Sequence, residues 1–345
     1  MKKVIVAPLD WGLGHASRCV PIIKALLQNQ FSPVIASDGK ALAFLRKEFP
    51  DLEVLKLPSY NVTYKKNLKW SLFKKIPSLL KTAKEERKII NRYVNENSNA
   101  VGIISDNRFG VYSSKIPSVY ITHQLNVLSG IFTPITSCFH QRIIKRFDEC
   151  WIPDEEGSLY SGRLSKSKRK LNQKYIGILS RFQKREVENT IAILIVLSGP
   201  EPNRSELELL LKQSFQDSEK SVVLVKGVVE EDQKEEMYRG IRVLNYMLSD
   251  ELEKALNTAS LVICRSGYSS IMDLVRLDKK ALLIPTENQN EQEFLAEYVK
   301  EKEFFSSINE KDFSIEALDF TKEFKNKTET GRDLDSRLFR LFQSK

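Results

Sequence analysis

The sequence predicts an α/β protein made of two doubly wound domains that face a cleft. Short apolar runs alternate with helical stretches through most of the chain, and several of these runs end in turns rich in Gly or Ser. Alternation of this kind makes the strands of a sheet parallel. The chain has 345 residues and a hydrophobic content of 41%, which is enough for two domains with sizeable cores.

The first domain is expected to span residues 1–157. Strands are predicted at residues 4–8, 33–37, 52–57, 101–105, 118–122 and 149–152, with helical stretches between them. In a doubly wound sheet, ligands bind in the crevice beyond the carboxyl ends of the strands. Polar residues that directly follow these strands are therefore the first candidates for function.

The turn after the first strand carries two glycines and a histidine. Gly12 and Gly14 allow a tight turn, and their spacing resembles a dinucleotide fingerprint whose third glycine is replaced by Ser17. His15 lies where this turn opens into a helix. Histidine exchanges protons readily near neutral pH, so His15 could act as a general base, or it could only cap the turn.

Two further polar clusters follow later strands of the same domain. Asp106 could serve as a second base or orient His15, and Asn107 with Arg108 could clamp an acceptor phosphate. His123 and Gln124 follow the next strand. Each cluster could instead cap the helix that comes after it. His140 lies in a predicted helix without an expected partner and is interpreted as structural.

Residues 158–174 are polar and basic and are predicted to form an exposed linker. The second domain, residues 175–328, has predicted strands at 192–197, 222–225, 241–244, 261–264 and 281–284. Residues 329–345 are predicted to form a final helix that can cross back to the first domain, because Leu334, Leu338, Leu341 and Phe342 have helical spacing.

The first strand of the second domain ends in a Ser-Gly turn, Ser198 and Gly199, before a helix. Such a turn suits a phosphate, and Arg204 could neutralise charge on a leaving diphosphate. Ser205 and Glu208 have the spacing of a capping box.

The stretch of residues 261–296 has the pattern strand, turn, helix, strand, turn, helix. In its first turn, Gly267 lets the backbone approach a ligand, and serine hydroxyls with a helix N-terminus suit a phosphate. Asp273, one helical turn later, could accept hydrogen bonds from a ribose. The alternative is that the serines only cap the helix. The polar residues of the two turns are Arg265, Ser266, Ser269, Ser270, Gln289, Glu291 and Gln292.

These residues carry a family resemblance. Cys264-Arg-Ser-Gly-x-x-Ser-x-x-Asp273, then Leu-Ile-Pro285 and Asn290-Glu-Gln292-x-x-x-Ala296, resembles the donor-binding signature of glycosyltransferase family 28. Trp11-Gly-Leu-Gly-His15 followed by Arg18 resembles the N-terminal loop of the same family. Asp273 and Glu291 stand where the type member, the N-acetylglucosaminyltransferase that forms lipid II, has Glu and Gln.

The resemblance implies a GT-B fold of two Rossmann-like domains. The C-terminal domain would bind a UDP-sugar, with Met247 and Leu248 beside the uracil, and the N-terminal domain would bind the acceptor, with His15 deprotonating it. The implied reaction inverts the anomeric carbon and needs neither a cofactor nor a metal. The implied acceptor side comprises Gly12, Gly14, Arg18, Asn107, Arg108, His123 and Gln124.

Charge adds one more expectation. The net charge is +9, and ten Lys or Arg but only two acids lie in residues 64–92, interleaved with Trp and Phe. Such a segment could lie on an anionic membrane surface or form an ordinary solvated helix. No nucleic-acid motif accompanies it. The four cysteines lack metal or disulfide spacing, and neither a spanning segment nor a signal peptide is expected, which favours the cytoplasm or the inner membrane face.

The sequence therefore predicts transfer of a hexose or N-acetylhexosamine, N-acetylglucosamine first, from a UDP-sugar to a lipid-linked or cell-envelope acceptor. Three alternatives stay open. One is a nucleotide-sugar epimerase on the same fold, another is a non-catalytic UDP-sugar-binding subunit, and the third is a dehydrogenase that uses the turn from Gly12 to Ser17.

Overall fold

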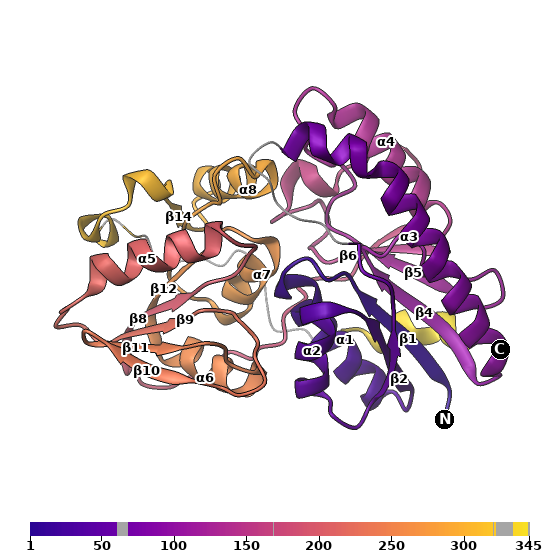
Figure 1. The fold of residues 1–345 in the computed structure, drawn as a ribbon, viewed down its shortest axis with the longest axis horizontal. Helices are drawn as coiled ribbons and strands as arrows, with labels where there is room; N and C mark the ends of the chain where they lie inside the picture. Colours follow the sequence, from indigo (N-terminus) through magenta and orange to yellow (C-terminus); the bar gives the residue numbers. More distant parts are fainter. Residues whose placement is uncertain (61–67, 168, 320, 322–333, 344–345) are drawn as a thin grey trace. The chain divides into compact units, whose positions relative to one another are not determined.

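The computed structural model describes residues 1–60, 68–167, 169–319, 321 and 334–343, and only the backbone of residues 68–76. The chain divides into two compact units, coloured along the sequence in Figure 1. The first comprises Met1–Trp11, His15–Leu179 and Arg332–Lys345, and the second comprises Gly12–Gly14 and Ser180–Gly331.

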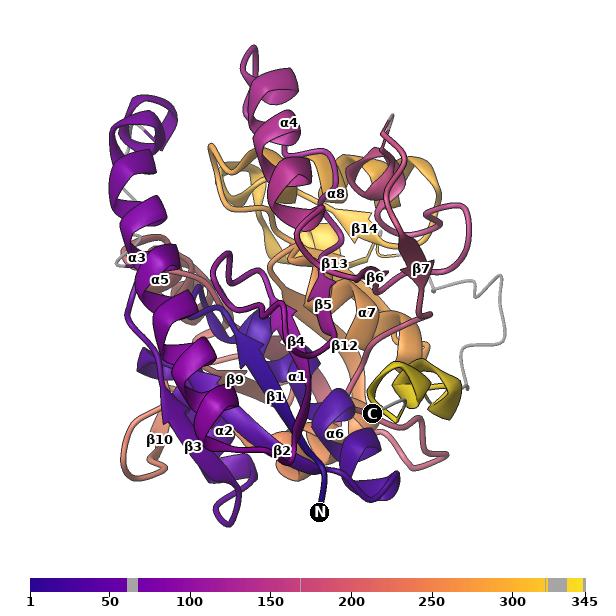
Figure 2. The same ribbon diagram turned by 90° about the vertical axis from the view of Figure 1, so that its right-hand side faces the viewer.

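The first unit is built on a sheet whose described strands all run parallel, in the order β3-β2-β1-β4-β5-β6-β7 (Figure 2). This confirms the predicted doubly wound domain. Its strands are β1 (Lys3–Pro8), β2 (Ser32–Ser37), β3 (Glu53–Lys56), β4 (Ala100–Asp106), β5 (Ser118–Ile121), β6 (Glu149–Ile152) and β7 (Gln173–Tyr175). Its helices are α1 (Leu13–Gln28), α2 (Gly39–Glu48), α3 (Leu68–Glu96) and α4 (Thr133–Ile144), with a 3-10 turn, η1 (Gly162–Ser165).

Apolar side chains from α3 and α4 cover one face of this sheet. Ile90 and Val94 of α3 pack against Ile5 and Ile103 of the central strands. Ile143 and Ile144 of α4 pack against Tyr120, Cys150 and Ile152 of β5 and β6. Alternation of side chains along each strand turns Asp106 to the opposite face, because its neighbour Ser105 lies in register with Tyr120.

Residues 158–174 do not form the exposed linker that their polar composition suggested. Tyr160 and Leu164 are fully buried in the first unit, and Gln173–Tyr175 add β7 to the edge of the first sheet. A three-residue edge strand needs few apolar side chains, so it leaves little signal in the sequence. The second unit accordingly begins at Ser180 and not at Tyr175.

The second unit has a sheet in the order β10-β11-β9-β8-β12-β13-β14, in which only the described pair β10 and β11 is antiparallel. Its strands are β8 (Ile191–Val196), β9 (Val222–Val225), β10 (Glu235–Tyr238), β11 (Ile241–Leu244), β12 (Ala259–Cys264), β13 (Ala281–Leu283) and β14 (Ser306–Ser307). Its helices are α5 (Asn203–Phe215), α6 (Ser249–Thr258), α7 (Tyr268–Leu277) and α8 (Asn290–Glu301), with 3-10 turns η2 (Glu310–Asp312) and η3 (Ile315–Leu318).

The core of the second unit lies between its sheet and α5. Leu207, Leu211 and Phe215 recur at the helical spacing of four residues and pack on Ile195 and Ile263 of the central strands. Both units are therefore Rossmann-like, as the sequence predicted.

The C-terminal segment packs on the first unit, opposite α3 and α4. It is a 3-10 helix, η4 (Ser336–Phe342), where a longer α-helix was predicted; residues 329–333 and 344–345 of that prediction lie outside the described residues. The rings of Phe339 and Phe342 lie 6.2 and 6.4 Å from Trp151 and 6.3 and 6.5 Å from Phe31, measured between ring centroids.

Gly102 in β4 makes room for this aromatic cluster. A Cβ atom at Gly102 would lie 2.2 Å from a ring carbon of Phe342. We expect Gly102→Ala to destabilise the first unit by about 1–3 kcal/mol, the usual effect of overpacking a core. Urea unfolding of Gly102→Ala measured in the wild-type and Phe342→Ala backgrounds tests this. An equal loss of stability in both backgrounds would contradict the assigned contact.

Candidate active site

A buried carboxylate at the carboxyl end of β4 organises the polar residues of the first unit. Asp106 ends β4 and is fully buried. His15 and Arg18 lie three residues apart near the start of α1, so they share one face of that helix. His15 Nδ1 lies 2.8 Å from Asp106 Oδ1, and Arg18 holds both carboxylate oxygens through Nε and Nη2.

The charge state of Asp106 follows from these partners. Burial alone would raise its pKa, but Arg18 and His15 outweigh burial and lower the pKa to about 2. Asp106 is therefore ionised at every physiological pH and is too weak a base to accept a substrate proton. Of the two predicted bases, the geometry favours His15, with Asp106 as the group that orients it.

The positions of the protons follow from which atoms can donate. His15 Nδ1 lies 2.8 Å from Asp106 Oδ1, which only accepts, and 2.8 Å from Arg18 Nη2, which only donates. In the tautomer that donates Nδ1–H to Asp106, the lone pair of His15 lies on Nε2. Arg18 Nη1 lies 3.2 Å from His123 Nδ1, and because guanidinium only donates, this ring nitrogen of His123 carries a lone pair and Nε2 carries the proton. With His15 in that tautomer, the cluster combines a lone pair on His15 Nε2 with an N–H donor on His123 Nε2.

Arg108 does not belong to this cluster, although it was predicted to clamp an acceptor phosphate. It is fully buried and donates to Glu86 and Asp38 at 2.7 and 2.6 Å, and to the carbonyl of Pro58 at 2.6 Å. Burial raises the pKa of Glu86, which also accepts from Tyr60. Arg108 therefore joins α3 to the ends of the central strands and cannot turn to a substrate.

A second polar network includes two predicted residues, Asn107 and Gln124, and one residue that was misjudged, His140. Asn107 adopts a φ of 58°, which is uncommon for a residue other than glycine, and its amide lies 3.1 Å from the hydroxyl of Tyr120. His140 was expected to lack partners. Its Nε2 lies 3.0 Å from Tyr120 Oη and its Nδ1 lies 2.9 Å from the carbonyl oxygen of Gln124.

The loop between β1 and α1 contains Gly12, and Gly14 is the second residue of α1. Gly12 has a φ of 76°, a conformation that glycine adopts without strain, and the space beside it is open. This agrees with the predicted tight turn before His15.

The donor signature of the second unit forms two adjoining turns at the carboxyl ends of β12 and β13. Gly267 is the N-cap of α7 and makes no side-chain cap hydrogen bond, so Ser269 and Ser270 lie in a first turn whose N–H groups the N-cap side chain does not satisfy. Ser266 Oγ donates to the carbonyl of Gln292 at 2.8 Å, and Gln292 Oε1 accepts from Thr286 N at 2.9 Å. Ser266 and Gln292 therefore hold the two turns together.

Asp273 projects from α7 toward residues that the sequence reading overlooked. Its Oδ1 accepts from Ser180 Oγ at 2.6 Å, and the charge of Arg181 also acts on it. Burial raises the pKa of Asp273 to about 6, against the lowering effects of Arg181 and Ser180. Ser180 and Arg181 lie a few residues beyond the misread linker, and only their position in space marks them.

Two arginines predicted near a diphosphate are already paired. Arg265 is 1% exposed and donates to Glu310 at 2.7 Å and to the carbonyls of Asn203 and Pro285. Arg204 donates to Glu201 and Glu208, both at 2.7 Å. Glu208 therefore does not form the predicted capping box, and α5 begins at Asn203 instead of after Ser205.

The remaining donor-side residues lie on loops at the same end of the sheet. Ser198 and Gly199 follow β8 and are partly exposed. Met247 is buried, and Leu248 is the partly exposed N-cap of α6. Gln289 is the N-cap of α8, with a buried Oε1 that has no hydrogen-bond partner among the described residues, and Glu291 lies in the first turn of that helix.

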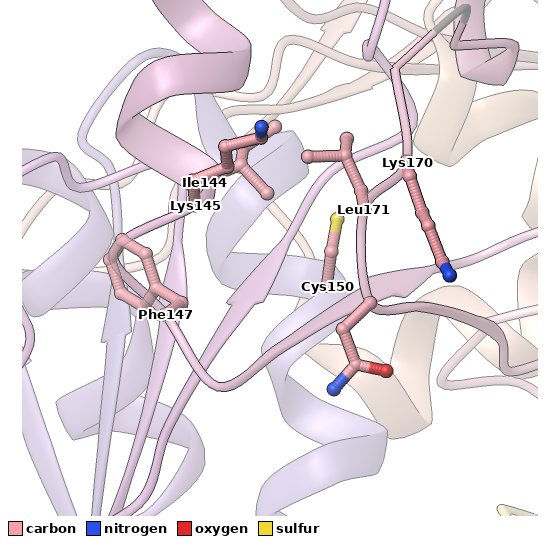
Figure 3. A pocket seen from close by; sticks show the side chains of 7 residues that line it. Ile144, Lys145, Phe147, Cys150, Lys170 and Leu171 are labelled. Carbon is pink, nitrogen blue, oxygen red and sulfur yellow. The ribbon is translucent and has the colours of Figure 1, made fainter.

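A small pocket in the first unit lies at the wrong end of the sheet for catalysis. Ile144, Lys145, Cys150 and Lys170 are among its lining residues (Figure 3). It adjoins the amino ends of β6 and β7, whereas ligands of parallel sheets bind at the carboxyl ends. Across the described parts of the chain, no His, Cys, Asp or Glu cluster could hold a metal ion, and no helix is long and apolar enough to cross a membrane.

Comparison with solved structures shows the fold. The calicheamicin glycosyltransferase CalG4 has a TM-score of 0.62 at 10% identity, with 93% of this chain and 89% of that chain covered. The glycotransferase of kitacinnamycin has a TM-score of 0.61 at 12% identity, with 92% and 88% covered. MurG of Acinetobacter baumannii has a TM-score of 0.54 at 13% identity, with 93% and 89% covered. The protein therefore has the GT-B fold of glycosyltransferases.

The second unit matches a family model. Residues 193–328 match the family model for the glycosyltransferase family 28 C-terminal domain, whereas no curated protein matches the chain. The second unit thus carries a family 28 C-terminal domain, and with the GT-B fold this makes the chain a nucleotide-sugar-dependent glycosyltransferase. This agrees with the resemblance seen in the donor signature of the second unit.

The raised pKa of Asp273 predicts a pH-dependent affinity for the donor. If its carboxylate binds a ribose hydroxyl, protonation below about pH 6 removes an acceptor, so affinity for a UDP-sugar should fall as the pH drops from 7 to 5. Calorimetry should use a UDP-sugar, because its diphosphate diester does not titrate in this range as UDP does. Asp273→Asn should bind more weakly at pH 7 and lose most of the pH dependence; an unchanged dependence would contradict the assignment.

Proposed function

We propose that this protein transfers a hexose or N-acetylhexosamine, N-acetylglucosamine first, from a UDP-sugar to a lipid-linked acceptor. The observation that carries the proposal is the pairing of partly exposed His15 with buried Asp106 in a chain with a family 28 C-terminal domain. His15 Nε2 would take the proton of the acceptor hydroxyl as its oxygen attacks the anomeric carbon, with inversion. Asp106 would stabilise the imidazolium that forms.

The donor side is proposed to use backbone groups more than arginines. Both nearby arginines are committed to carboxylates, so the uncapped first turn of α7 after Gly267 is the main source of positive potential for a diphosphate. Asp273 would accept from the ribose, and Gln289 and Glu291 would face the sugar hydroxyls. No cofactor or metal enters this proposal.

A lipid-linked acceptor is supported by an exposed apolar tip on the first unit. Ile131 is 88% exposed and Ile135 is 61% exposed at the start of α4. The described part of α3 adds four exposed basic residues at helical spacing, Lys81, Lys84, Lys88 and Arg92. The side chains of residues 64–76, which carry the rest of the predicted basic segment, lie outside the described residues. Exposed isoleucines can insert among lipid chains, and a row of basic side chains can bind anionic headgroups, so both features fit an anionic lipid surface.

The donor is tested by thermal unfolding with a panel of nucleotide-sugars. At 100 times its dissociation constant, the true donor should stabilise the protein by about 2.7 kcal/mol. UDP-sugars should raise the unfolding temperature, while GDP- and CDP-sugars should not. A protein that responds to no uridine nucleotide would refute the proposal.

The acceptor side is tested by sedimentation with vesicles of phosphatidylcholine, with and without phosphatidylglycerol. Wild-type protein should bind the anionic vesicles, and Ile131→Ser with Ile135→Ser should weaken binding about tenfold or more, since each buried isoleucine contributes about 1.5–3 kcal/mol. Leu209→Ser, which changes a 57% exposed leucine on α5, is the matched control. Equal binding by all three proteins would count against a lipid surface.

A further inference from the structure

His140 in α4 lies in an enclosed site between the two polar loops of the first unit. It is 7% exposed, and the rings of Tyr120 and Phe109 lie 5.6 and 6.0 Å from its own, between centroids. Burial, with a smaller effect of His123, lowers its pKa to about 4. His140 is therefore neutral at physiological pH, with one ring proton to place.

The backbone fixes which nitrogen carries that proton. His140 Nδ1 lies 2.9 Å from the carbonyl oxygen of Gln124, which can only accept. A lone pair on Nδ1 would face another lone pair and leave two buried acceptors without a donor, so Nδ1 carries the proton. Nε2 then accepts, and its partner at 3.0 Å is the hydroxyl of Tyr120.

The proton of Tyr120 is thereby committed to His140. Tyr120 is fully buried and burial raises its pKa, so the phenol stays protonated and has a single hydrogen to donate. The amide of Asn107 lies 3.1 Å from the same oxygen. Since Tyr120 can only accept from Asn107, the amide nitrogen must face it, which corresponds to a 180° turn of the amide from the orientation with Oδ1 toward Tyr120.

We infer that His140 is a positioning residue: through Tyr120 it turns the amide of Asn107 so that the NH₂ group faces inward and the carbonyl oxygen is presented to the acceptor substrate. The inference rests on the proposed acceptor role of this unit. Asn107 is partly exposed directly after Asp106, and no other described residue hydrogen-bonds its amide. The acceptor would therefore contribute a hydrogen-bond donor, a hydroxyl or an amine, at this point.

The proton positions can be read directly, because the chain has three histidines. Long-range ¹H–¹⁵N spectra of protein with labelled histidine, assigned by substitution, should show His140 protonated on Nδ1 and not on Nε2 near pH 7. Tyr120→Phe should shift Nε2 toward the value of an unbonded imine. A proton on Nε2 of His140, alone or with one on Nδ1, would overturn the inference, whatever nucleotide binding shows.

The role of Asn107 in turnover is tested by measuring the slow hydrolysis of UDP-N-acetylglucosamine, in which water takes the place of the acceptor hydroxyl. Asn107→Ala should lower kcat about three- to tenfold, the effect of one hydrogen bond, with the donor KM unchanged. Tyr120→Phe should lower kcat less, and Asn95→Ala, an exposed position, should not change it. An unchanged kcat in Asn107→Ala would overturn the role of Asn107, while donor binding would still decide the proposed function separately.

Discussion

Replacing His15 with alanine should lower turnover of the UDP-sugar about 10²- to 10⁴-fold, the usual contribution of a general base. His15 Nδ1 is held by Asp106, so Nε2 is the nitrogen that can accept a substrate proton, and alanine removes it. The dissociation constant of the UDP-sugar should change little, because the donor signature lies on the second unit. UDP release and calorimetry measure the two quantities.

Two further variants separate the base from its orienting group. Asp106→Asn keeps the size of the side chain but removes its charge. His15 is then no longer held in the tautomer with the proton on Nδ1, so turnover should also fall. Lys24→Ala changes an exposed residue of the same helix and should leave turnover unaltered. If His15→Ala kept wild-type turnover, the base would lie elsewhere; if the variant kept its cellular role without any turnover, a binding subunit would be favoured.

Replacing Arg108 with methionine should destabilise the protein by about 3–5 kcal/mol. The change leaves the carboxylates of Glu86 and Asp38 buried without their cation, and removing one partner of a buried ion pair has this cost. The midpoint of urea denaturation measures the loss.

Neutralising a carboxylate should recover part of that loss. Arg108→Met combined with Glu86→Gln removes one uncompensated charge and should be more stable than Arg108→Met alone. Arg239→Met provides the control, because Arg239 is exposed and its ion pair with Asp217 spans 4.0 Å. If Arg108 instead contacted the acceptor, its substitution would raise the acceptor KM and leave stability nearly unchanged.

The sequence predicted the elements that bury apolar side chains. All the central strands of both sheets were found, because their apolar runs are continuous. The missed strands β7, β10 and β14 lie at sheet edges, where Glu235 and Glu236 or the two serines of β14 give no apolar signal. The final helix was overestimated because leucine spacing alone does not distinguish a short 3-10 turn from an α-helix.

For polar residues of the candidate site, the sequence predicted positions but not hydrogen-bond partners. Sequence order could place Asp106 and His15 at neighbouring strand ends, and the structure brings them together. It could not show that Arg108 and Arg204 would be neutralised, since Glu86 is 22 residues away in the chain and the partners of Arg204 look like ordinary helix residues. His140 was dismissed because its partner on Gln124 is a backbone carbonyl, which any residue supplies.

The short, charged outer strands bear on how the protein behaves at high concentration. β14 has two residues and β7 has three, and β10 carries the exposed Glu235 and Glu236, so these three of the described edge strands offer little template for another chain to extend. Resistance to intermolecular strand pairing is thus built into these three edges. Changing both glutamates of β10 to threonine would make this edge strand uncharged and favourable for β-structure. The variant should then self-associate, which light scattering would measure.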